Sequence, residues 1–383
     1  MTALSIDICI PAKPLFQKVF AHPGSILSAG AVGPVISAFL AGYAIGQLIC
    51  GPIADRQGRR PVLLWGLLIF TLAGFACTFS QTLGQLIFFR FIQGLSGSVG
   101  PTLARAMVRD KYSRQEAAGV LSQITQAMIL APVLAPILGV FLLKIGWREV
   151  FAALGVIGIY LVVVCGLKLP ETLAKREEGD VTGRVIHNFR TVLAHRGSRP
   201  YIFAVGFSYS GLFAYIMGSP DVFTESGFGL DKQTFALLFA VIAFSLMVGA
   251  TVNRKLLPRL GALTLLRRGA AVLFVSGAVL LLLAWQAPGI PGVTLPMMGY
   301  LFALGLVAPN ATALAMEPHG KLAGVVSSVI GFIQTAGGAI AGQVVNHFFD
   351  HSPKSLAAVV AFLATMTLLI VSRATQHPPE AAH

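Results

Sequence analysis

The sequence predicts an all-α protein that crosses a membrane many times. Of its 383 residues, 55% are hydrophobic and only 11% are charged, whereas about 25% of the residues in an ordinary soluble domain are charged. The mean hydropathy is +0.78. Apolar runs of roughly 20 residues, enough to cross a hydrocarbon layer as a helix, recur along almost the whole chain. No room is left for a separate soluble domain.

The apolar runs predict eleven full spans, near residues 32–53, 61–79, 84–107, 117–143, 149–167, 200–220, 233–252, 264–285, 292–315, 322–345 and 355–373. The segment before them, "MTALSIDICIP", is apolar except for Asp7, but ten residues of helix rise only about 15 Å, half the thickness of the hydrocarbon layer. We interpret it as the end of a twelfth span whose beginning is missing. It has no basic segment of the kind that opens a cleavable signal peptide, so we treat it as part of the fold.

The formal net charge of +13 reports orientation in the membrane rather than nucleic-acid binding. If residues 54–60 lie in the cytoplasm, 21 of the 28 Lys and Arg residues fall on that side and six on the other, while Arg90 lies inside a span. This asymmetry predicts a multi-pass membrane protein with a cytoplasmic C-terminus. The four cysteines lie in or beside apolar runs without C-x-x-C spacing, which predicts buried free thiols and neither disulfides nor a metal site.

The longest polar stretch, residues 168–200, divides the spans into two groups of similar size. We therefore expect an N-terminal half over residues 1–167, a cytoplasmic linker over 168–199, a C-terminal half over 200–374 and a short cytoplasmic tail over 375–383. Within the linker, "FRTVLAH" suits a short surface helix, but the density of charge favours a solvated connection.

The two halves repeat each other at an offset near 200 residues. Three pairs of segments occur in the same order in both halves: "ADR" (54–56) with "VNR" (252–254), "PTLARAM" (101–107) with "PNATALAM" (309–316), and "AGVLS" (118–122) with "AGVVS" (323–327). An internal repeat of six spans is the simplest account, although chance similarity between apolar segments would explain any single pair. Transporters built from two such halves bind substrate near the middle of the membrane and rock one half against the other.

The stretch "GPIADRQGRRP" (51–61) concentrates charge in an otherwise apolar region. We expect Gly51 to end a span where little bulk is tolerated, Gly58 to let the chain reverse and Pro61 to open the next helix. Arginines alone would set the orientation, so Asp55 needs a separate role: it can face a helix N-terminus or an arginine and latch one conformation. A charged turn that only sets the topology is an equally good interpretation.

The same stretch resembles the loop between the second and third spans of the major facilitator superfamily. The match consists of a glycine, an Asp-Arg pair and a Gly-Arg-Arg triplet at fixed spacing: Gly51, Asp55, Arg56, Gly58, Arg59 and Arg60. The resemblance implies a fold of two six-helix halves. It also implies a loop that stabilises the outward-facing state and releases during the switch.

Arg90 lies inside a span, where an ionised side chain costs about 2.5–3.5 kcal/mol on insertion scales. This cost predicts a buried partner, although the side chain can also extend toward the membrane interface. With Gln93 and Gly94, Arg90 resembles the fourth-span motif Arg-x-x-Gln-Gly of the superfamily.

Asp7, in "LSIDICIP", is the obvious counter-charge to Arg90, and its segment resembles the end of the first span of drug:proton antiporters. A carboxylate that alternates between a buried setting and an arginine takes up and releases a proton. We therefore expect Asp7 and Arg90 to form the proton-coupling site, at which proton and substrate compete. The alternative is a structural ion pair or an aspartate at the membrane interface.

The stretch "QAMILAPVLAPILGVFLL" (126–143) places Pro132 and Pro136 one turn apart, with Gly139 on nearly the same face. The prolines bend the helix and the glycine permits a close approach, although an ordinary proline kink is the plainer interpretation. The stretch resembles the antiporter motif of span five in the bicyclomycin and chloramphenicol resistance group. Three further segments resemble spans seven, ten and eleven of that group: 211–223, 308–328 and 331–342.

Two features depart from the pattern of that group. The first span is incomplete, which bears on the setting of Asp7. Asp221 stands where the group usually has an apolar or aromatic residue.

A substrate cavity between the halves is predicted from aromatic and amide side chains that suit a large apolar ligand: Tyr43, Gln47, Phe91, Gln93, Phe207, Phe213, Tyr215 and Asn310. Aromatic residues at helical spacing more often serve packing alone. The sequence contains no soluble-enzyme motif and no P-loop, so we expect no enzyme activity, no direct use of ATP, no cofactor and no metal.

These observations and the resemblance lead to one expectation and two alternatives. We expect a monomeric, proton-coupled antiporter that exports small amphipathic drugs from the bacterial cytoplasm by alternating access. The first alternative keeps the fold but exports an endogenous metabolite or siderophore. The second, of another class, is a membrane-embedded enzyme or sensor.

Overall fold

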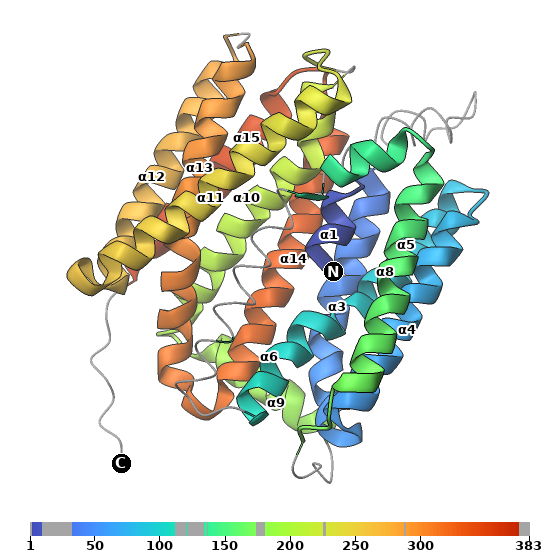
Figure 1. Ribbon diagram of the computed structural model, residues 1–383. Helices are drawn as coiled ribbons and strands as arrows, with labels where there is room; N and C mark the ends of the chain where they lie inside the picture. Colours follow the sequence, from blue (N-terminus) through green and yellow to red (C-terminus); the bar gives the residue numbers. More distant parts are fainter. Residues whose placement is uncertain are drawn as a thin grey trace. The chain divides into compact units, whose positions relative to one another are not determined.

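The computed structural model describes residues 2–9, 33–111, 120, 134–135, 137–173, 181–224, 227–286 and 289–374. Regular structure in these ranges is entirely helical (Figure 1). The chain divides into two compact units. The first unit comprises Met1–Val185 with Lys232–Leu237, and the second comprises Ile186–Asp231 with Leu238–His383.

The helices of the first unit whose two ends both lie in described residues are α1 (Thr2–Asp7), α3 (Gly33–Gln57), α4 (Arg59–Thr78), α5 (Leu83–Gly97), α6 (Val99–Lys111) and α8 (Trp147–Lys168), and residues 137–143 are helical as well. Helix α5 begins at a capping box, in which the Thr82 hydroxyl accepts from the amide of Gln85 and the Gln85 side chain accepts from the amide of Thr82. Only Ser98 separates α5 from α6, so together they occupy the predicted span 84–107.

The remaining helices are α9 (Val181–Ala194), which crosses the boundary between the units, α10 (Arg199–Phe223), α11 (Lys232–Leu260), α12 (Ala262–Ala284), α13 (Ile290–Met316), the 3-10 helix η2 (Glu317–Leu322), α14 (Ala323–His347) and α15 (Lys354–Arg373). The first turns of α11 belong to the first unit and the rest of the helix to the second. Helix α9 contains most of "FRTVLAH", which confirms the short surface helix, and most of its side chains there are exposed or half-buried.

The predicted spans are confirmed wherever the structure describes them. Nine of the described helices are long and apolar enough to cross a membrane, and the paired α5 and α6 account for a tenth span. The predicted span 117–143 lies mostly outside the described residues. Helix α11 continues eight residues past the predicted end at 252, through Pro258 to Leu260.

In the first unit, α3 packs against α5 at a crossing built on glycine. A Cβ atom at Gly94 of α5 would collide with the backbone carbonyl of Phe39 in α3. A Cβ atom at Gly42 of α3 would collide with the carbonyl of Phe91 in α5. Each helix therefore presents a glycine to the backbone of the other, the close approach that small residues allow between membrane helices.

The second unit repeats this crossing between α11 and α13. A Cβ atom at Gly249 would collide with the carbonyl of Phe302, and one at Gly305 would lie 2.7 Å from the carbonyl oxygen of Leu246. Gly249 follows Gly42 by 207 residues and Gly305 follows Gly94 by 211. The internal repeat is therefore visible in backbone packing as well as in sequence.

The structural repeat corrects one of the three sequence pairs. At the offset of 207 residues that relates α3 to α11, Asn253 corresponds to Gly46 and not to Asp55. The pairing of "ADR" with "VNR" is therefore wrong, because "ADR" lies in the last turn of α3 whereas "VNR" lies well before the end of α11.

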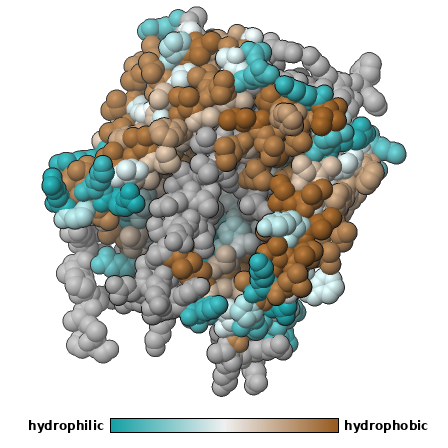
Figure 2. Space-filling model, viewed as in Figure 1, coloured by the Kyte–Doolittle hydropathy of each residue, from teal (hydrophilic) through white to brown (hydrophobic). Residues whose placement is uncertain are grey.

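The flanks of the helices carry large exposed hydrophobic side chains, including Trp65 at 64% exposure, Phe79 at 77% and Leu167 at 82%. Figure 2 shows hydrophobic side chains over much of the visible face, with hydrophilic ones gathered toward the helix ends. Soluble monomers rarely expose apolar patches of this extent. The pattern is that of helices whose outer faces contact lipid and whose ends contact water.

Candidate functional site

The charged stretch at 51–61 forms a helical hairpin with a turn of one residue. Helix α3 continues through Gln57, Gly58 has a φ of +111°, and α4 begins at Arg59. A side chain is strained at this φ, which explains the glycine. Gly51 lies inside α3, where an added Cβ atom would have no neighbour within 4 Å. The expectation that Gly51 ends the span is therefore wrong.

An ionic network joins the two helices of the hairpin to α6. Arg59 Nη1 lies 2.6 Å from the Asp55 carboxylate, and Arg59 Nε donates to Asp110 at 3.2 Å. Arg59 is largely buried between the two acids, so its guanidinium bridges α3 and α6 from the first turn of α4. Of the two partners expected for Asp55, the structure places an arginine beside it.

The carboxylate at the N-terminus of α4 belongs to Glu171, just after α8. Glu171 accepts hydrogen bonds from the amides of Arg59 at 3.0 Å and Arg60 at 3.2 Å, and from the amides of Thr172 and Leu173. Arg60 Nη2 also donates to the carbonyl of Gly166 at 2.6 Å. Partial burial opposes ionisation, but the four amides outweigh it and hold the pKa of Glu171 below its ordinary value. Sequence reasoning missed Glu171, although "LPETL" follows a predicted span on the same membrane side.

Replacement of Glu171 by alanine is expected to expose the first amides of α4 and lower the stability of the hairpin by about 1 kcal/mol, the usual value of a lost helix cap. Because the folded pKa of Glu171 is depressed, its contribution is present above the unfolded pKa near about 4.3 and is lost only as the pH falls through the folded value. Hydrogen exchange of Arg59 and Arg60 at neutral pH measures the effect. Glu171→Gln keeps an acceptor, so its protection at these amides should lie between that of the wild type and that of Glu171→Ala. Equal protection in all three proteins would contradict the cap.

Arg90 is completely buried in α5, so the alternative in which it extends to the interface is wrong. Its Nη1 donates to the Ser5 hydroxyl at 3.1 Å and to Gln93 Oε1 at 2.8 Å, and its Nη2 donates to the Ser5 carbonyl at 3.2 Å. The guanidinium carbon also lies 4.3 Å from the centre of the Phe39 ring and 5.7 Å from that of Phe151. These neutral dipoles and π faces form what we call the arginine cage.

The spacing of the fourth-span motif has a direct physical reading in this cage. Gln93 is three residues after Arg90 and therefore lies on the same helix face, where it accepts from the guanidinium. Gly94 is the contact with the backbone of Phe39, and the ring of Phe39 covers Arg90. Gly94 thus lets α3 approach closely enough for the Phe39 ring to lie over the Arg90 guanidinium. Arg90 Nε and Gln93 Nε2 have no hydrogen-bond acceptor within the described part of the chain.

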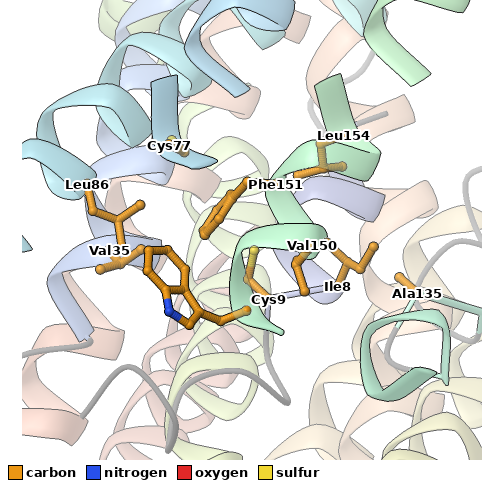
Figure 3. Packing of buried hydrophobic residues seen from close by; sticks show 10 residues of the cluster. Ile8, Cys9, Val35, Cys77, Leu86, Ala135, Val150, Phe151 and Leu154 are labelled. Atoms are coloured by element: carbon orange, nitrogen blue, oxygen red, sulfur yellow. The ribbon is translucent and has the colours of Figure 1, made fainter. Parts of the chain in front are cut away.

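The end of α1 is anchored beside the cage. Ile8 and Cys9 pack in a buried cluster with Val150 and Phe151 of α8 (Figure 3). Gly139 lies against the carbonyl of Ile8, where a Cβ atom would collide with it.

Several residues of the predicted coupling machinery lie wholly or partly outside the described structure. Asp7 is the last residue of α1, two positions after Ser5, and its side chain lies outside the described structure. Pro132 and Pro136 also lie outside it. The Asp7–Arg90 pair and the bent helix therefore stay predictions.

The predicted cavity residues fall into two groups, one in each unit. In the first unit, Gln93 belongs to the cage, Tyr43 and Gln47 are buried in α3, and Phe91 is half-buried. Gln47 Oε1 has no hydrogen-bond donor among the described residues.

The second group lies in the second unit, mostly on α10. Phe207 stacks on Phe203, Phe213 packs over Gly338, and Tyr215 stacks on Phe239 with ring centres 5.4 Å apart. The Tyr215 hydroxyl is buried without a partner in the described ranges.

Asn310 completes the second group, and Asp221, which departs from the pattern of the resistance group, lies in the same unit. Asn310 donates to Asn253 at 2.5 Å and to the Leu306 carbonyl at 2.7 Å, joining α13 to α11. Asp221 is buried in the last turn of α10. The structure thus pairs Gln93 with Arg90 and Asn310 with Asn253, while the lining of a cavity by the whole set stays a prediction.

Two helical units with matching glycine crossings and apolar outer flanks define a multi-pass membrane protein built from a repeat. The chain belongs to the Major Facilitator Superfamily, whose family model matches residues 1–342. Membership in this family indicates a transporter rather than the membrane-embedded enzyme of the second alternative.

Relatives place the chain within the bicyclomycin and chloramphenicol resistance group of that superfamily. It is 30% identical to an uncharacterised MFS-type transporter, YdgK, of Bacillus subtilis, over 89% of this chain and 85% of the relative. It is 30% identical to a bicyclomycin resistance protein homolog of Haemophilus influenzae, over 81% and 78%. A chloramphenicol resistance protein of Pseudomonas aeruginosa is 26% identical over 97% and 86%.

The fold is also that of solved transporters. A D-xylose-proton symporter superposes with a TM-score of 0.75 over 96% of this chain and 94% of its own, at 15% identity. At this identity the likeness concerns the fold alone.

Proposed function

We propose that the protein is a proton-coupled antiporter that exports small amphipathic drugs, such as compounds like chloramphenicol or bicyclomycin, across the bacterial inner membrane by alternating access. It works as a monomer with its C-terminus in the cytoplasm. The observation that carries the proposal is the arginine cage, a fully buried guanidinium held by neutral groups directly beside the end of α1. The resistance proteins among its relatives support the choice of cargo.

In this proposal Arg90 is the fixed charge and Asp7 the variable one. A guanidinium does not release its proton under biological conditions, so Arg90 stays cationic throughout the cycle. Asp7, two residues from the serine that accepts from Arg90, carries the exchangeable proton. Protonation from outside neutralises Asp7 and weakens its attraction to Arg90, and substrate entering from the cytoplasm favours the loss of that proton.

The hairpin provides the conformational switch in the same proposal. Gly51, Asp55, Arg56, Gly58, Arg59 and Arg60 move as one element, because Arg59 and Glu171 tie the turn to α6 and to the chain after α8. The bent helix predicted at 126–143, with Pro132, Pro136 and Gly139, links the switch to the coupling site through the contact of Gly139 with the carbonyl of Ile8. The aromatic and amide groups of the predicted cavity contact the cargo.

The decisive experiment measures drug or dye efflux in everted membrane vesicles, with and without a proton-gradient uncoupler. We expect accumulation of the drug in the vesicles that collapses on uncoupling, and we expect Asp7→Asn to abolish it because an amide carries no exchangeable proton. Asp350→Asn, which changes an exposed acid in the α14–α15 loop, is the matched control and should transport normally. Undiminished coupled transport by Asp7→Asn would remove Asp7 from the mechanism. Failure of the wild type to move any of a broad panel of drugs would overturn drug export.

A further inference from the structure

Outside the proposed transport machinery, the second unit contains a compact group of two histidines and a serine. His195 follows α9, Ser198 directly precedes α10, and His319 lies in η2 after α13. The Ser198 hydroxyl oxygen lies 2.8 Å from His195 Nδ1 and 2.7 Å from His319 Nε2. Ser198 is completely buried and His319 is 8% exposed. The charge pattern of the sequence puts the linker and the α13–α14 turn on the cytoplasmic side.

The positions of the protons in this group follow from its geometry. The backbone amide of Ser198 donates to His195 Nδ1 at 3.1 Å, so that nitrogen is an acceptor and carries no proton. The hydroxyl has one proton, and both of its short contacts are attractive only if it donates to His195 Nδ1 and accepts from His319 Nε2. The hydrogen bonds therefore run from His319 through Ser198 to His195.

An added proton has opposite consequences at the two rings. His319 can take it on its free Nδ1 and keep its bond to Ser198. His195 can take it only on Nδ1, so the bond from the Ser198 amide is lost and the hydroxyl must turn to accept from the new N–H. The ring centres are 4.8 Å apart, so two imidazolium ions would also repel each other. Histidine is the side chain whose charge ordinarily changes between about pH 5 and about pH 8.

The charged groups near the two histidines are Arg196, Arg199, Glu317, Arg267 and Lys321. Arg196 and Arg199 flank Ser198 and are exposed. Glu317 of η2 and Arg267 of α12, which carry opposite charges, both lie within electrostatic reach of Tyr201 in the first turn of α10. Arg267 also donates to the carbonyl of Ala374 at 3.0 Å. The side chain of Lys321 in η2 lies outside the described structure.

We propose that His195, Ser198 and His319 form a proton-sensitive staple that holds the start of α10 to η2, and that acidification of the cytoplasm opens it and slows export. The functional part rests on the proposed antiport, in which each cycle delivers protons to the cytoplasm. The staple would then respond to a product of transport. Loss of the bond at His195 frees the amide of Ser198, and repulsion between the two charged rings draws His319 away from Ser198, which separates the linker from the turn between α13 and α14.

Hydrogen exchange of the purified full-length protein in lipid nanodiscs tests the staple without any transport. Between about pH 8 and about pH 5.5, after correction for intrinsic exchange, we expect the wild type to lose about tenfold in protection at residues 198–202 and in η2. His195→Asn places an oxygen acceptor near the position of Nδ1 and cannot be protonated, so its protection should not change with pH. His187→Asn, an exposed histidine of α9, is the matched control and should behave like the wild type.

A second variant keeps the test decisive if His195→Asn is unprotected at every pH. His319→Gln retains an N–H donor for Ser198 but removes the second cation, so its staple should form at high pH and open at a lower pH than in the wild type. Opening of His319→Gln at the wild-type pH, or the same pH dependence in His195→Asn and the wild type, would overturn the staple.

Efflux with a clamped pH on the cytoplasmic face, at a constant pH difference, tests the functional part. The wild type should lose several-fold in rate over the range that opens the staple, and His195→Asn should keep its rate. Equal loss in both proteins would overturn the regulatory role. A pH-dependent exchange pattern in a protein that transports nothing would instead overturn the proposed antiport and leave the staple intact.

Discussion

Replacement of Arg90 by lysine is expected to reduce proton-driven export at least tenfold while the protein still inserts into the membrane. Lysine keeps the charge, but its compact ammonium cannot bond Ser5 and Gln93 together while stacking on Phe39. A hydrogen bond to a charged group contributes about 1.5–3 kcal/mol, so the loss of one already shifts an equilibrium by about tenfold or more. Initial efflux rates in everted vesicles, normalised to the amount of protein in the membrane, measure the effect.

Arg148→Lys is the matched control for this substitution. Arg148 lies in the first turn of α8, is exposed, donates to the carbonyls of Thr78 and Ser80, and lies over the ring of Trp147. It therefore makes the same kinds of contact as Arg90 but in water, where they contribute little. We expect its efflux rate to stay within about twofold of the wild type on that argument. Wild-type efflux by Arg90→Lys would show that the detailed geometry of the cage is not needed for coupling.

Gly94→Val is expected to prevent stable folding of the first unit. A Cβ atom at Gly94 would lie 2.8 Å from the carbonyl carbon and 3.0 Å from the Cα of Phe39, and closer still to the carbonyl oxygen. These are backbone atoms that cannot rotate away, so α3 and α5 must separate. Overpacking of this kind costs about 1–3 kcal/mol or more, which exceeds the gain of about 1 kcal/mol or less from removing a helical glycine. The yield and melting temperature of monodisperse protein in detergent measure the loss.

Two other glycines make this prediction specific. Gly84, in the first turn of α5, has no neighbour within 4 Å of an added Cβ atom, so Gly84→Ala should be neutral or slightly stabilising. Gly305 occupies the equivalent crossing in the second unit, and Gly305→Val should destabilise as Gly94→Val does. A melting temperature for Gly94→Val equal to that of Gly84→Ala would contradict the crossing as a point of close approach.

The spans were predictable because hydropathy records a requirement that applies to every membrane helix separately. The run at 149–167 became α8 (Trp147–Lys168), and the run at 264–285 became α12 (Ala262–Ala284). Predicted boundaries were wrong where a helix continues beyond its apolar run, because hydropathy marks the end of the run and not the end of the helix. Helix α11 runs on to Leu260, and α3 runs past Gly51 to Gln57.

Within the candidate site, local spacing encodes contacts along one helix but not contacts between helices. The bond from Arg90 to Gln93 follows from a separation of three residues on a helix. The roles of Ser5 and Phe39 depend on how α1 and α3 meet α5, and no short-range pattern encodes that meeting. Glu171 was missed for the same reason, because it caps a helix that begins more than a hundred residues earlier in the chain.

The single-residue joint at Gly58 has a mechanical consequence. Only the two backbone torsions of Gly58 separate α3 from α4, so the connection has no spare length. A rotation of either helix must therefore turn the other. The two helices are therefore expected to move together as a rigid pair. The flexible segments that a rocking motion needs must then lie in other parts of the chain.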